Sequence, residues 1–454
     1  MPRIRPRPLD DPPPYSLAVT RTQRLARLAL YLGLALHLLF LVSYQTQWLA
    51  PLFHESRHSP GQAADFFGIY HAGDRLLHGE TIYESPDWPP TPTPDRARSR
   101  VPYGYFYRYL PPTAYAFAPV AALLAPWPAY WAWVAFIELL LIAYVLALGR
   151  LGLSQALCDT LRGVSLGYFP FWLEQWMGQF TWPLALLIAV TLFAPPRSPR
   201  SFWAWVAAIS LKQFPALFGW VYLRLGWWKH VAWAALAVIA LSAPYFLFFP
   251  EDLRHFIRIN LGGLPPRLHV GSYGMVSLIR ALAAHLPGGM TEWRLGPFTP
   301  YPATVLVYLW TLVVAALSLA TTWCVARPDQ RVPELCSLWV CAFLLVFKDV
   351  WEYHAVLLLP VVAALVVSAS RLRRPRLLAT VLAAGTISAL PTLYLLYAEW
   401  AERPVESWPI ALTLLHYGMK VGPVLALFVV SARVASARVA SERLASRPGD
   451  PRAS

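Results

Sequence analysis

The chain has 454 residues, of which 57% are hydrophobic, 14% aromatic and 14% charged, and its mean hydropathy is +0.45. Soluble domains carry about 25% charged residues, so this composition excludes a soluble globular protein and indicates one polytopic membrane domain. The net charge of +14 lies mostly in arginine clusters before, between and after the apolar segments, and no basic groove with interleaved aromatic residues is present, which argues against a nucleic-acid partner.

Apolar runs follow one another along the chain and predict an all-α polytopic membrane protein with about 12 transmembrane helices. Their bounds are 25–49, 109–125, 128–149, 163–176, 180–195, 202–223, 231–249, 302–325, 334–347, 354–370, 377–398 and 409–431. Several are shorter than the roughly 20 residues that cross a bilayer core. The first run is long and lacks a small-residue cleavage site, so we expect a retained anchor.

Arginines predict the orientation of this bundle. They precede the first run, cluster at 371–376 and follow the last run, and the positive-inside rule therefore places both termini in the cytoplasm. The resulting domains are a disordered basic tail over 1–24, a transmembrane domain over 25–431 and a basic tail over 432–454. Counting runs also places Arg197 outside, against the rule, so the topology of residues 150–201 stays open.

Two long loops are expected on the extracytoplasmic side, over residues 50–108 and 250–301. Long loops beside short ones usually carry function. The high content of arginine, proline, alanine and tryptophan is typical of a high-GC bacterium, and hence of its cytoplasmic membrane.

Asp65 lies just after the first apolar run, in the sequence DFFGIYHAGDRLLHGETIY of residues 65–83. A carboxylate at the membrane interface costs free energy unless it has a partner or a role. We expect a general base, or else a helix N-cap or a solvated loop acid. Asp74 is a second acid nearby, either paired with an arginine or involved in binding a sugar or acceptor.

Cations occur at several edges of apolar runs and could hold a phosphate. Arg108 precedes the second run and could contact a phosphate or Asp65, or could snorkel to the interface. Lys212 lies midway in the run 202–223, where an ionisable residue indicates a functional site, as an anion contact or an ion-pair partner. Lys348 and His354 share one membrane edge, either as phosphate ligands or within a salt-bridged loop.

Three further residues complete the set of candidates. Arg267 in the second long loop could contact a phosphate, and His269 beside it could contact the sugar or acceptor. Gln179 lies between two short runs after Glu174, and indicates either a polar cavity wall or an interfacial turn. No metal-ligand motif, phosphate-binding loop or dinucleotide-binding fingerprint is present, so no cofactor is expected.

These motifs together resemble the opening of glycosyltransferase family 87, the DUF2029 group of GT-C membrane glycosyltransferases. The resemblance rests on DFFGIY at 65–70 and YRYLPP at 107–112, with Gly178, KQFP at 212–215 and His354 in matching order, and it covers roughly residues 60–420. Family members include polyprenol-phosphate-mannose-dependent α-mannosyltransferases. A proline-rich insert at 86–100 departs from the family pattern.

The resemblance implies a GT-C-like fold and an extracytoplasmic active site that uses a polyprenyl-phosphate sugar. It also implies a catalytic base in the first outside loop, where Asp65 is the matching residue. We therefore expect inverting transfer of a hexose, mannose by this resemblance, to a lipid or envelope glycan acceptor in the bilayer. The phosphate leaves as an anion, which nearby cations would stabilise.

Two other functions remain open at this stage. A transporter or flippase for a lipid-linked or anionic solute would line its path with Lys212 and Glu174. A catalytically inactive scaffold of an envelope assembly complex would need neither residue. No internal repeat is visible, which weighs against an inverted-repeat transporter.

Overall fold

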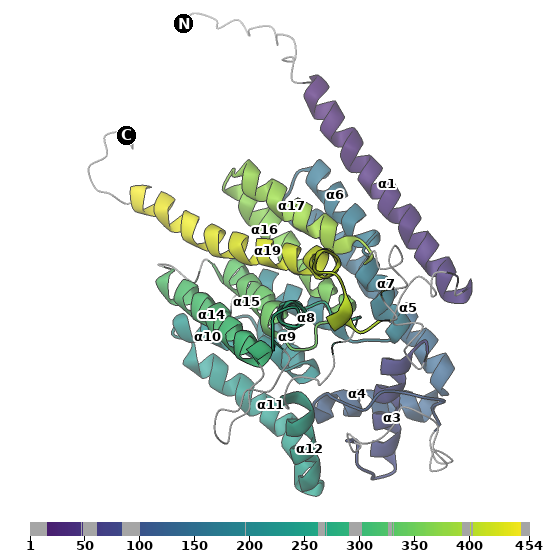
Figure 1. The fold of residues 1–454 in the computed structure, drawn as a ribbon. Coiled ribbons are helices and arrows are strands. Elements are labelled where there is room, and N and C mark those ends of the chain that lie inside the picture. The colour runs from purple at the N-terminus through teal and green to yellow at the C-terminus, as the bar shows by residue number, and fades with distance from the viewer. Residues whose placement is uncertain are drawn as a thin grey trace, which may run out of the picture.

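The computed structural model confirms the all-helical class (Figure 1). It describes residues 16–46, 48, 61–83, 100–195, 197–261, 268, 270–289, 302–325, 329, 331–392, 400 and 403–445. Within these residues the regular structure is α- and 3-10-helical, apart from an isolated β-bridge between Ser272 and Trp351. The predicted site residues Arg267 and His269 lie outside the described residues.

The helices follow the apolar runs of the sequence, with several short ones added between them. The α-helices are α1 Ser16–Thr46, α3 Ala64–Leu77, α4 Pro111–Leu123, α5 Pro126–Ala147, α6 Gln155–Leu166, α7 Phe169–Met177, α8 Thr181–Phe193, α9 Pro199–Leu211, α10 Gly219–Arg224, α11 Trp228–Phe248, α12 Pro250–Leu261, α13 Met275–Ala283, α14 Pro302–Cys324, α15 Val332–Val346, α16 Leu358–Arg371, α17 Pro375–Ala389 and α19 Ile410–Ala445. The 3-10 helices are η3 Leu148–Arg150, η4 Phe214–Phe218, η6 Glu352–Leu357 and η8 Val405–Ser407.

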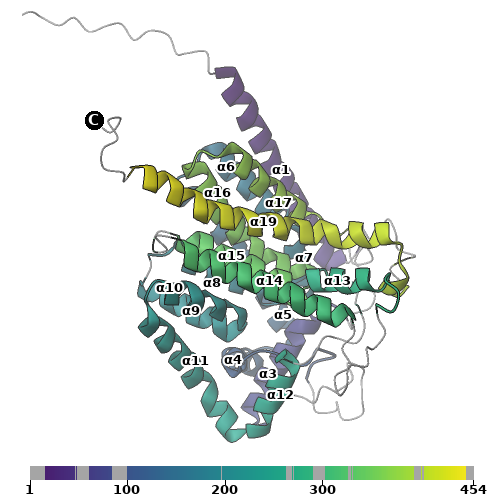
Figure 2. The same cartoon turned by 60° about the vertical axis from the view of Figure 1, so that its left-hand side comes forward.

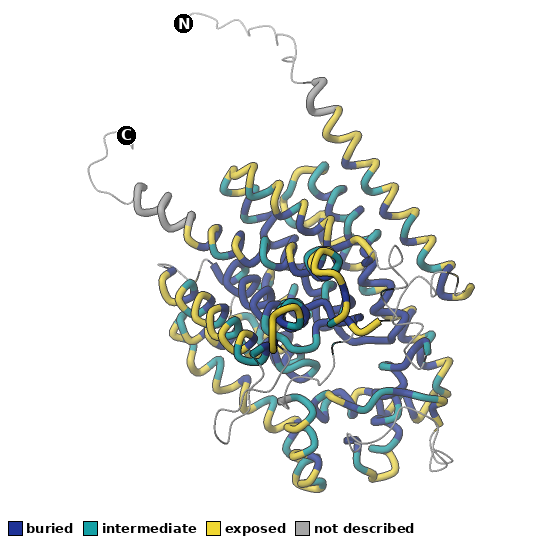
Figure 3. Tube along the Cα trace, in the orientation of Figure 1, coloured by how far each residue is buried: buried dark blue, intermediate teal, exposed yellow. Residues whose placement is uncertain are grey.

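Six helices of the described chain are long and apolar enough to cross a membrane, so the predicted number of about 12 is not confirmed. They are Arg21–Thr46, Pro126–Arg150, Trp228–Phe248, Pro302–Cys324, Glu352–Arg371 and Ile410–Ser436. The span Glu352–Arg371 is almost entirely buried, whereas most of Trp228–Phe248 is accessible (Figure 3). The first therefore forms the centre of the bundle, and the second lies at its periphery.

The helices of the two termini extend beyond the predicted transmembrane domain. Helix α1 begins at Ser16, within the segment 1–24 that the sequence assigns to a tail. Helix α19 continues through Ala445, within the segment 432–454. The run 163–176 is interrupted, because α6 ends at Leu166 and α7 begins at Phe169.

The run 109–125 does not carry the chain to the other end of the bundle, which corrects the predicted topology. Its helix α4 packs along α3. At the end of α4, the Tyr70 hydroxyl of α3 donates to the carbonyl of Leu124 at 2.7 Å. At the start of α5, the ring of Trp127 lies 5.1 Å from the ring of Phe67 in α3. The chain thus enters α5 beside the N-terminal half of α3. With 13 residues, α4 spans only about 20 Å, and hydropathy alone cannot distinguish such a helix from a crossing one.

The run 202–223 reverses at Lys212, so this residue is not midway along one helix as the sequence predicted. Helix α9 ends at Leu211, and Lys212 has an extended backbone with φ −146° and ψ 135°. The ring of Pro215 would clash with the carbonyl of Leu211 in a continuous helix. The rings of Trp205 and Tyr222 lie 4.7 Å apart, which shows α9 and α10 side by side.

Because α4 does not cross the bundle, Arg197 lies at the opposite end of the bundle from the one predicted, and the reversal at Lys212 returns Arg224 to that same end. The guanidinium of Arg197 lies 4.4 Å from the centre of the Trp227 ring, and the side chain of Arg224 donates to the carbonyls of Trp323 and Val325 at the end of α14. The sequence placed Arg197 outside and residues 224–229 inside, and this separation is wrong. The arginine-rich segments now share one end.

Candidate functional site

Asp65 lies in the first turn of α3, and the start of this helix is fixed by close backbone packing. The N–H of Ala63 donates to the carbonyl of Trp176 at 2.8 Å, and the N–H of Tyr105 donates to the carbonyl of Ala64 at 3.2 Å. Ala63 is completely buried and has a left-handed backbone with φ 68°, which is uncommon for a residue with a side chain. Such strain persists only where surrounding contacts determine it, and it is often found at functional sites.

Gly178 brings the turn between α7 and α8 against α3. It has φ +70°, and a Cβ atom at this position would lie 2.3 Å from the Cβ of Phe66. Both the conformation and the available space therefore require glycine. The next residue, Gln179, is thereby placed next to Asp65.

Gln179 connects three side chains from separate parts of the chain. Its carbonyl Oε1 accepts from the Tyr109 hydroxyl at 3.1 Å, and its Nε2 donates to the Tyr353 hydroxyl at 3.1 Å. Gln179 also forms a side-chain hydrogen bond with Asp65. An amide group has two N–H donors and one carbonyl acceptor, so these contacts fix its orientation. Gln179 is thus buried in the turn between α7 and α8, and its role in the wall of a cavity stays a prediction.

The surroundings of Asp65 raise the pKa of its carboxyl to about 6. The largest cause is burial, which penalises the charged form even though the side chain remains partly accessible. The hydrogen bond from Gln179 and the charges of Arg108 and Lys212 act in the opposite direction, while the charge of Asp349 adds to the increase. A carboxyl with this pKa can accept a proton near neutral pH.

Lys212 and His354 place two hydrogen-bond donors close to each other. Nζ of Lys212 donates to Oγ1 of Thr181 at 2.9 Å and lies 3.4 Å from Nε2 of His354. Nδ1 of His354 accepts from the N–H of Trp351 at 3.0 Å, so the neutral imidazole carries its proton on Nε2. An anion between the two groups would receive a hydrogen bond from each.

Arg108 and the loop before η6 lie at the rim of this cluster. The guanidinium of Arg108 is about half exposed, and its NH1 donates to Oδ2 of Asp349 at 3.2 Å. Lys348 precedes Asp349 on the same loop, and burial lowers the pKa of its ammonium group. The structure therefore brings Arg108, Gln179 and Lys212 next to Asp65. It places His354 beside Lys212, and Lys348 beside Asp349 and Arg108.

Asp74 is on the same helix as Asp65 but about 13 Å further along its axis. Its carboxylate is buried and pairs with Arg100, with Oδ1 and NH1 3.2 Å apart. This arrangement matches the arginine-paired alternative. A role for Asp74 in binding a sugar or acceptor stays a prediction.

Sequence reasoning missed three residues of the cluster, namely Tyr109, Thr181 and Tyr353. Each adjoins or closely follows a residue that was selected, but their side chains are ordinary for interfacial loops. Only the folded chain shows that the two tyrosines meet at Gln179.

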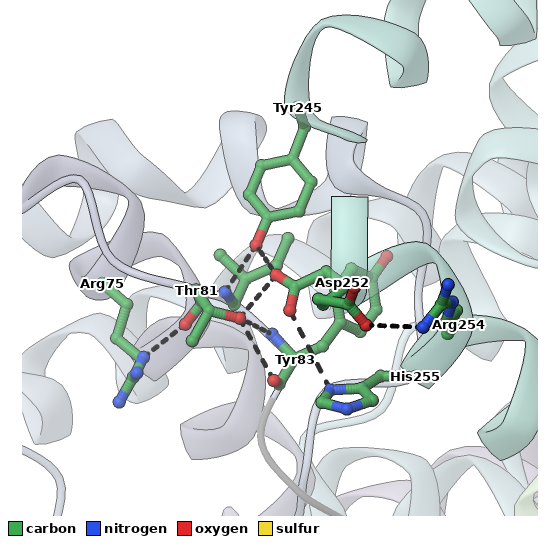
Figure 4. Close-up of polar contacts among 9 residues, drawn as sticks. Arg75, Thr81, Tyr83, Tyr245, Asp252, Arg254 and His255 are labelled. Carbon is green, nitrogen blue, oxygen red and sulfur yellow. Dashed lines mark hydrogen bonds and ion pairs between the residues drawn. The ribbon is translucent and has the colours of Figure 1, made fainter. Parts of the chain in front are cut away.

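A second polar cluster joins the turn after α3 to α11 and α12 (Figure 4). The carboxylate of Asp252 on α12 accepts from the hydroxyls of Tyr245 and Thr81, the latter at 2.5 Å. The Tyr83 hydroxyl donates to the carbonyl of Tyr109 at 2.5 Å. The turn after α3 is therefore held between α12 and the loop that carries Arg108.

Within the described residues, no three His, Cys, Asp or Glu side chains come together in an arrangement that could hold a metal ion. The family model that matches this chain is that of glycosyltransferase family 87, over residues 106–348, which is more than half of the sequence. No curated protein and no solved structure matches the chain.

Proposed function

The chain belongs to glycosyltransferase family 87, a membrane glycosyltransferase family, and from that premise we propose its reaction. It transfers a hexose, with mannose as the first candidate, from a polyprenyl-phosphate sugar to a lipid or envelope glycan acceptor. Asp65 is the general base. The observation that supports this proposal is the position of one carboxyl with a raised pKa beside converging hydrogen-bond donors.

The chemistry requires one base and a site for the leaving group. The acceptor hydroxyl loses its proton to the carboxylate of Asp65 as its oxygen forms a bond to the anomeric carbon. The bond from that carbon to the phosphate oxygen breaks, and its electron pair leaves with the polyprenyl phosphate. Attack from the face opposite the leaving group inverts the configuration, so a β-linked donor gives an α-linked product.

The leaving phosphate is assigned to the donors of Lys212 and His354. Both groups point to the same region, and charge that develops on a phosphate oxygen there would strengthen both hydrogen bonds. Arg108 and Lys348 lie at the rim, where they would contact the remaining phosphate oxygens. Arg108 would then exchange its contact with Asp349 for the phosphate.

The charge distribution supports an extracytoplasmic site. Arg197 and Arg224 lie at one end of the bundle. The turn between α16 and α17 lies at the same end, because Ser368 near the end of α16 donates to Glu334 at the start of α15. Lys212 and His354 lie at the opposite ends of α9 and of the span Glu352–Arg371. The positive-inside rule assigns the arginine-rich end to the cytoplasm. We therefore propose a bacterial cytoplasmic membrane location with the site facing outward.

Reconstitution tests this function directly. Purified protein in liposomes would be given a panel of labelled polyprenyl-phosphate sugars and a bacterial lipid extract as acceptor, with nucleotide sugars as the donor control. We expect transfer from one polyprenyl-phosphate sugar and none from nucleotide sugars. Transfer from a nucleotide sugar alone would contradict the donor class. Flux of the labelled lipid or solute across the bilayer without transfer would instead support a transporter.

A further inference from the structure

Helix α12 continues directly from an apolar surface. Helix α11 ends at Phe248, and its last two residues are among the most accessible of the described chain, with Leu247 80% and Phe248 83% exposed. Helix α12 begins two residues later at Pro250, and the chain turns sharply between the two (Figures 1 and 2). The start of α12 therefore lies at the edge of the surface that α11 presents to lipid.

The exposed side of α12 carries an apolar row next to a basic row. Leu253 and Ile257 are 42% and 47% exposed, and their spacing of four residues places them on one face. Arg254 and Arg258 follow each of them by one residue, so they form a parallel basic row about 100° around the helix. Glu251 pairs with Arg254 at 3.2 Å, but both are more than two-thirds exposed, and such a pair contributes little.

We propose that α12 lies in the membrane surface and that the face formed by Leu253, Arg254, Ile257 and Arg258 binds anionic lipid headgroups. The two apolar side chains would enter the boundary of the acyl chains, and the two guanidinium groups would contact lipid phosphates. The continuity with α11 and the charge of the basic row select an anionic bilayer surface over a protein partner.

The opposite side of α12 is attached to the candidate site. Asp252 accepts from Thr81, and the ring of Phe256 lies 5.8 Å from that of Tyr83. Nδ2 of Asn260 donates to the backbone carbonyl of Arg108 at 3.2 Å. The contact with lipid therefore also holds the backbone of Arg108. This inference does not depend on the sugar, the acceptor or the side of the membrane.

A fluorescent label measures where the helix lies. Ile257→Cys and, as a matched control on the same helix, Glu251→Cys would each carry an environment-sensitive label, with the exposed Cys324 replaced by serine. In vesicles we expect the label at 257 to be quenched by spin-labelled lipid and to shift to shorter wavelength. The label at 251 lies about 120° around the helix, beside Arg254 at the level of the headgroups, so it should be quenched less and shift less than the label at 257. Equal, water-like signals at both positions would overturn the proposal.

Lipid preference tests the basic row separately. Energy transfer from the label at 257 to fluorescent phosphatidylglycerol or phosphatidylcholine reports the local ratio of the two lipids. We expect enrichment of phosphatidylglycerol, up to about fivefold for each arginine, and its loss in the double variant Arg254→Gln, Arg258→Gln. The double variant Arg371→Gln, Arg374→Gln, at the other end, should retain it. Enrichment that survives the first substitution would overturn the assignment. Neither measurement requires sugar transfer.

Discussion

Nζ of Lys212 and Nε2 of His354 lie 3.4 Å apart. Both nitrogens are hydrogen-bond donors, because Nδ1 of His354 accepts from the N–H of Trp351. The two residues are 142 positions apart in the sequence, and they meet because the chain reverses at Lys212. This pair of donors defines the place that we assign to the donor phosphate.

Replacement of Lys212 by glutamine should weaken binding of the donor. A hydrogen bond to a charged group contributes about 1.5–3 kcal/mol, so we expect kcat/KM for the donor to fall by about 10- to 100-fold. Initial rates at varied donor concentration measure this effect. Lys229→Gln, at the arginine-rich end, is the control with an unchanged rate. An unchanged kcat/KM in Lys212→Gln would remove Lys212 from the phosphate site.

The pH dependence of transfer should report Asp65. The base acts in its ionised form, and its pKa is about 6, so kcat/KM should rise tenfold per pH unit below pH 6 and level off above it. A carboxyl at its ordinary value of 3.8 would give a flat profile between pH 5 and 8. That flat profile, measured with a donor that does not itself titrate in this range, would contradict the assignment.

Asp349→Asn should move the same profile to lower pH. The negative charge of Asp349 raises the pKa of Asp65, while the charge of Arg108 lowers it. The substitution removes the negative charge of Asp349 and leaves Arg108 without its carboxylate partner. Both changes favour the ionised form of Asp65 and therefore lower its pKa. Lys229→Gln, at the arginine-rich end, should not move the midpoint. A shift to higher pH would show that Asp349 acts in another way.

Gly178→Ala should destabilise the protein through the packing of α3. Its methyl group would need a left-handed backbone and would collide with Phe66, so we expect a loss of more than about 2 kcal/mol. Gly79→Ala is the matched control, because Gly79 also has φ +70° but has no atom within 4 Å of the added methyl. It should cost only about 1–2 kcal/mol, from the backbone alone. Unfolding midpoints in detergent compare the two, and equal losses would contradict the packing argument.

The sequence was sufficient to select some of the residues that the fold brings together near Asp65. Ionisable and amide groups are rare within apolar segments, so Lys212, Gln179 and His354 were conspicuous without any structure. The structure places them side by side, although the roles we assign to them stay proposals. The tyrosines that hold Gln179 could not be chosen, because interfacial tyrosines are common and only long-range contacts distinguish these two.

Topology was the weaker part of the sequence analysis. A run of about 15 apolar residues has the same hydropathy whether it crosses the bilayer, as a predicted span, or packs along a neighbouring helix, as α4 does on α3. Pro215 was a local signal for the reversal at Lys212, and the location of Arg197 against the positive-inside rule was a second sign. Both point to the segments that the structure rearranges.

The most direct test of the proposed mechanism is sugar transfer by Asp65→Asn in liposomes. Asp159→Asn is the matched control, because Asp159 is also a buried aspartate on a helix, paired with Arg162. The uncharged amide at position 65 cannot accept the proton, so we expect a loss of at least about 100-fold in kcat, with folding retained and the control fully active. Transfer by Asp65→Asn at the rate of the unmodified protein would show that Asp65 is not the base.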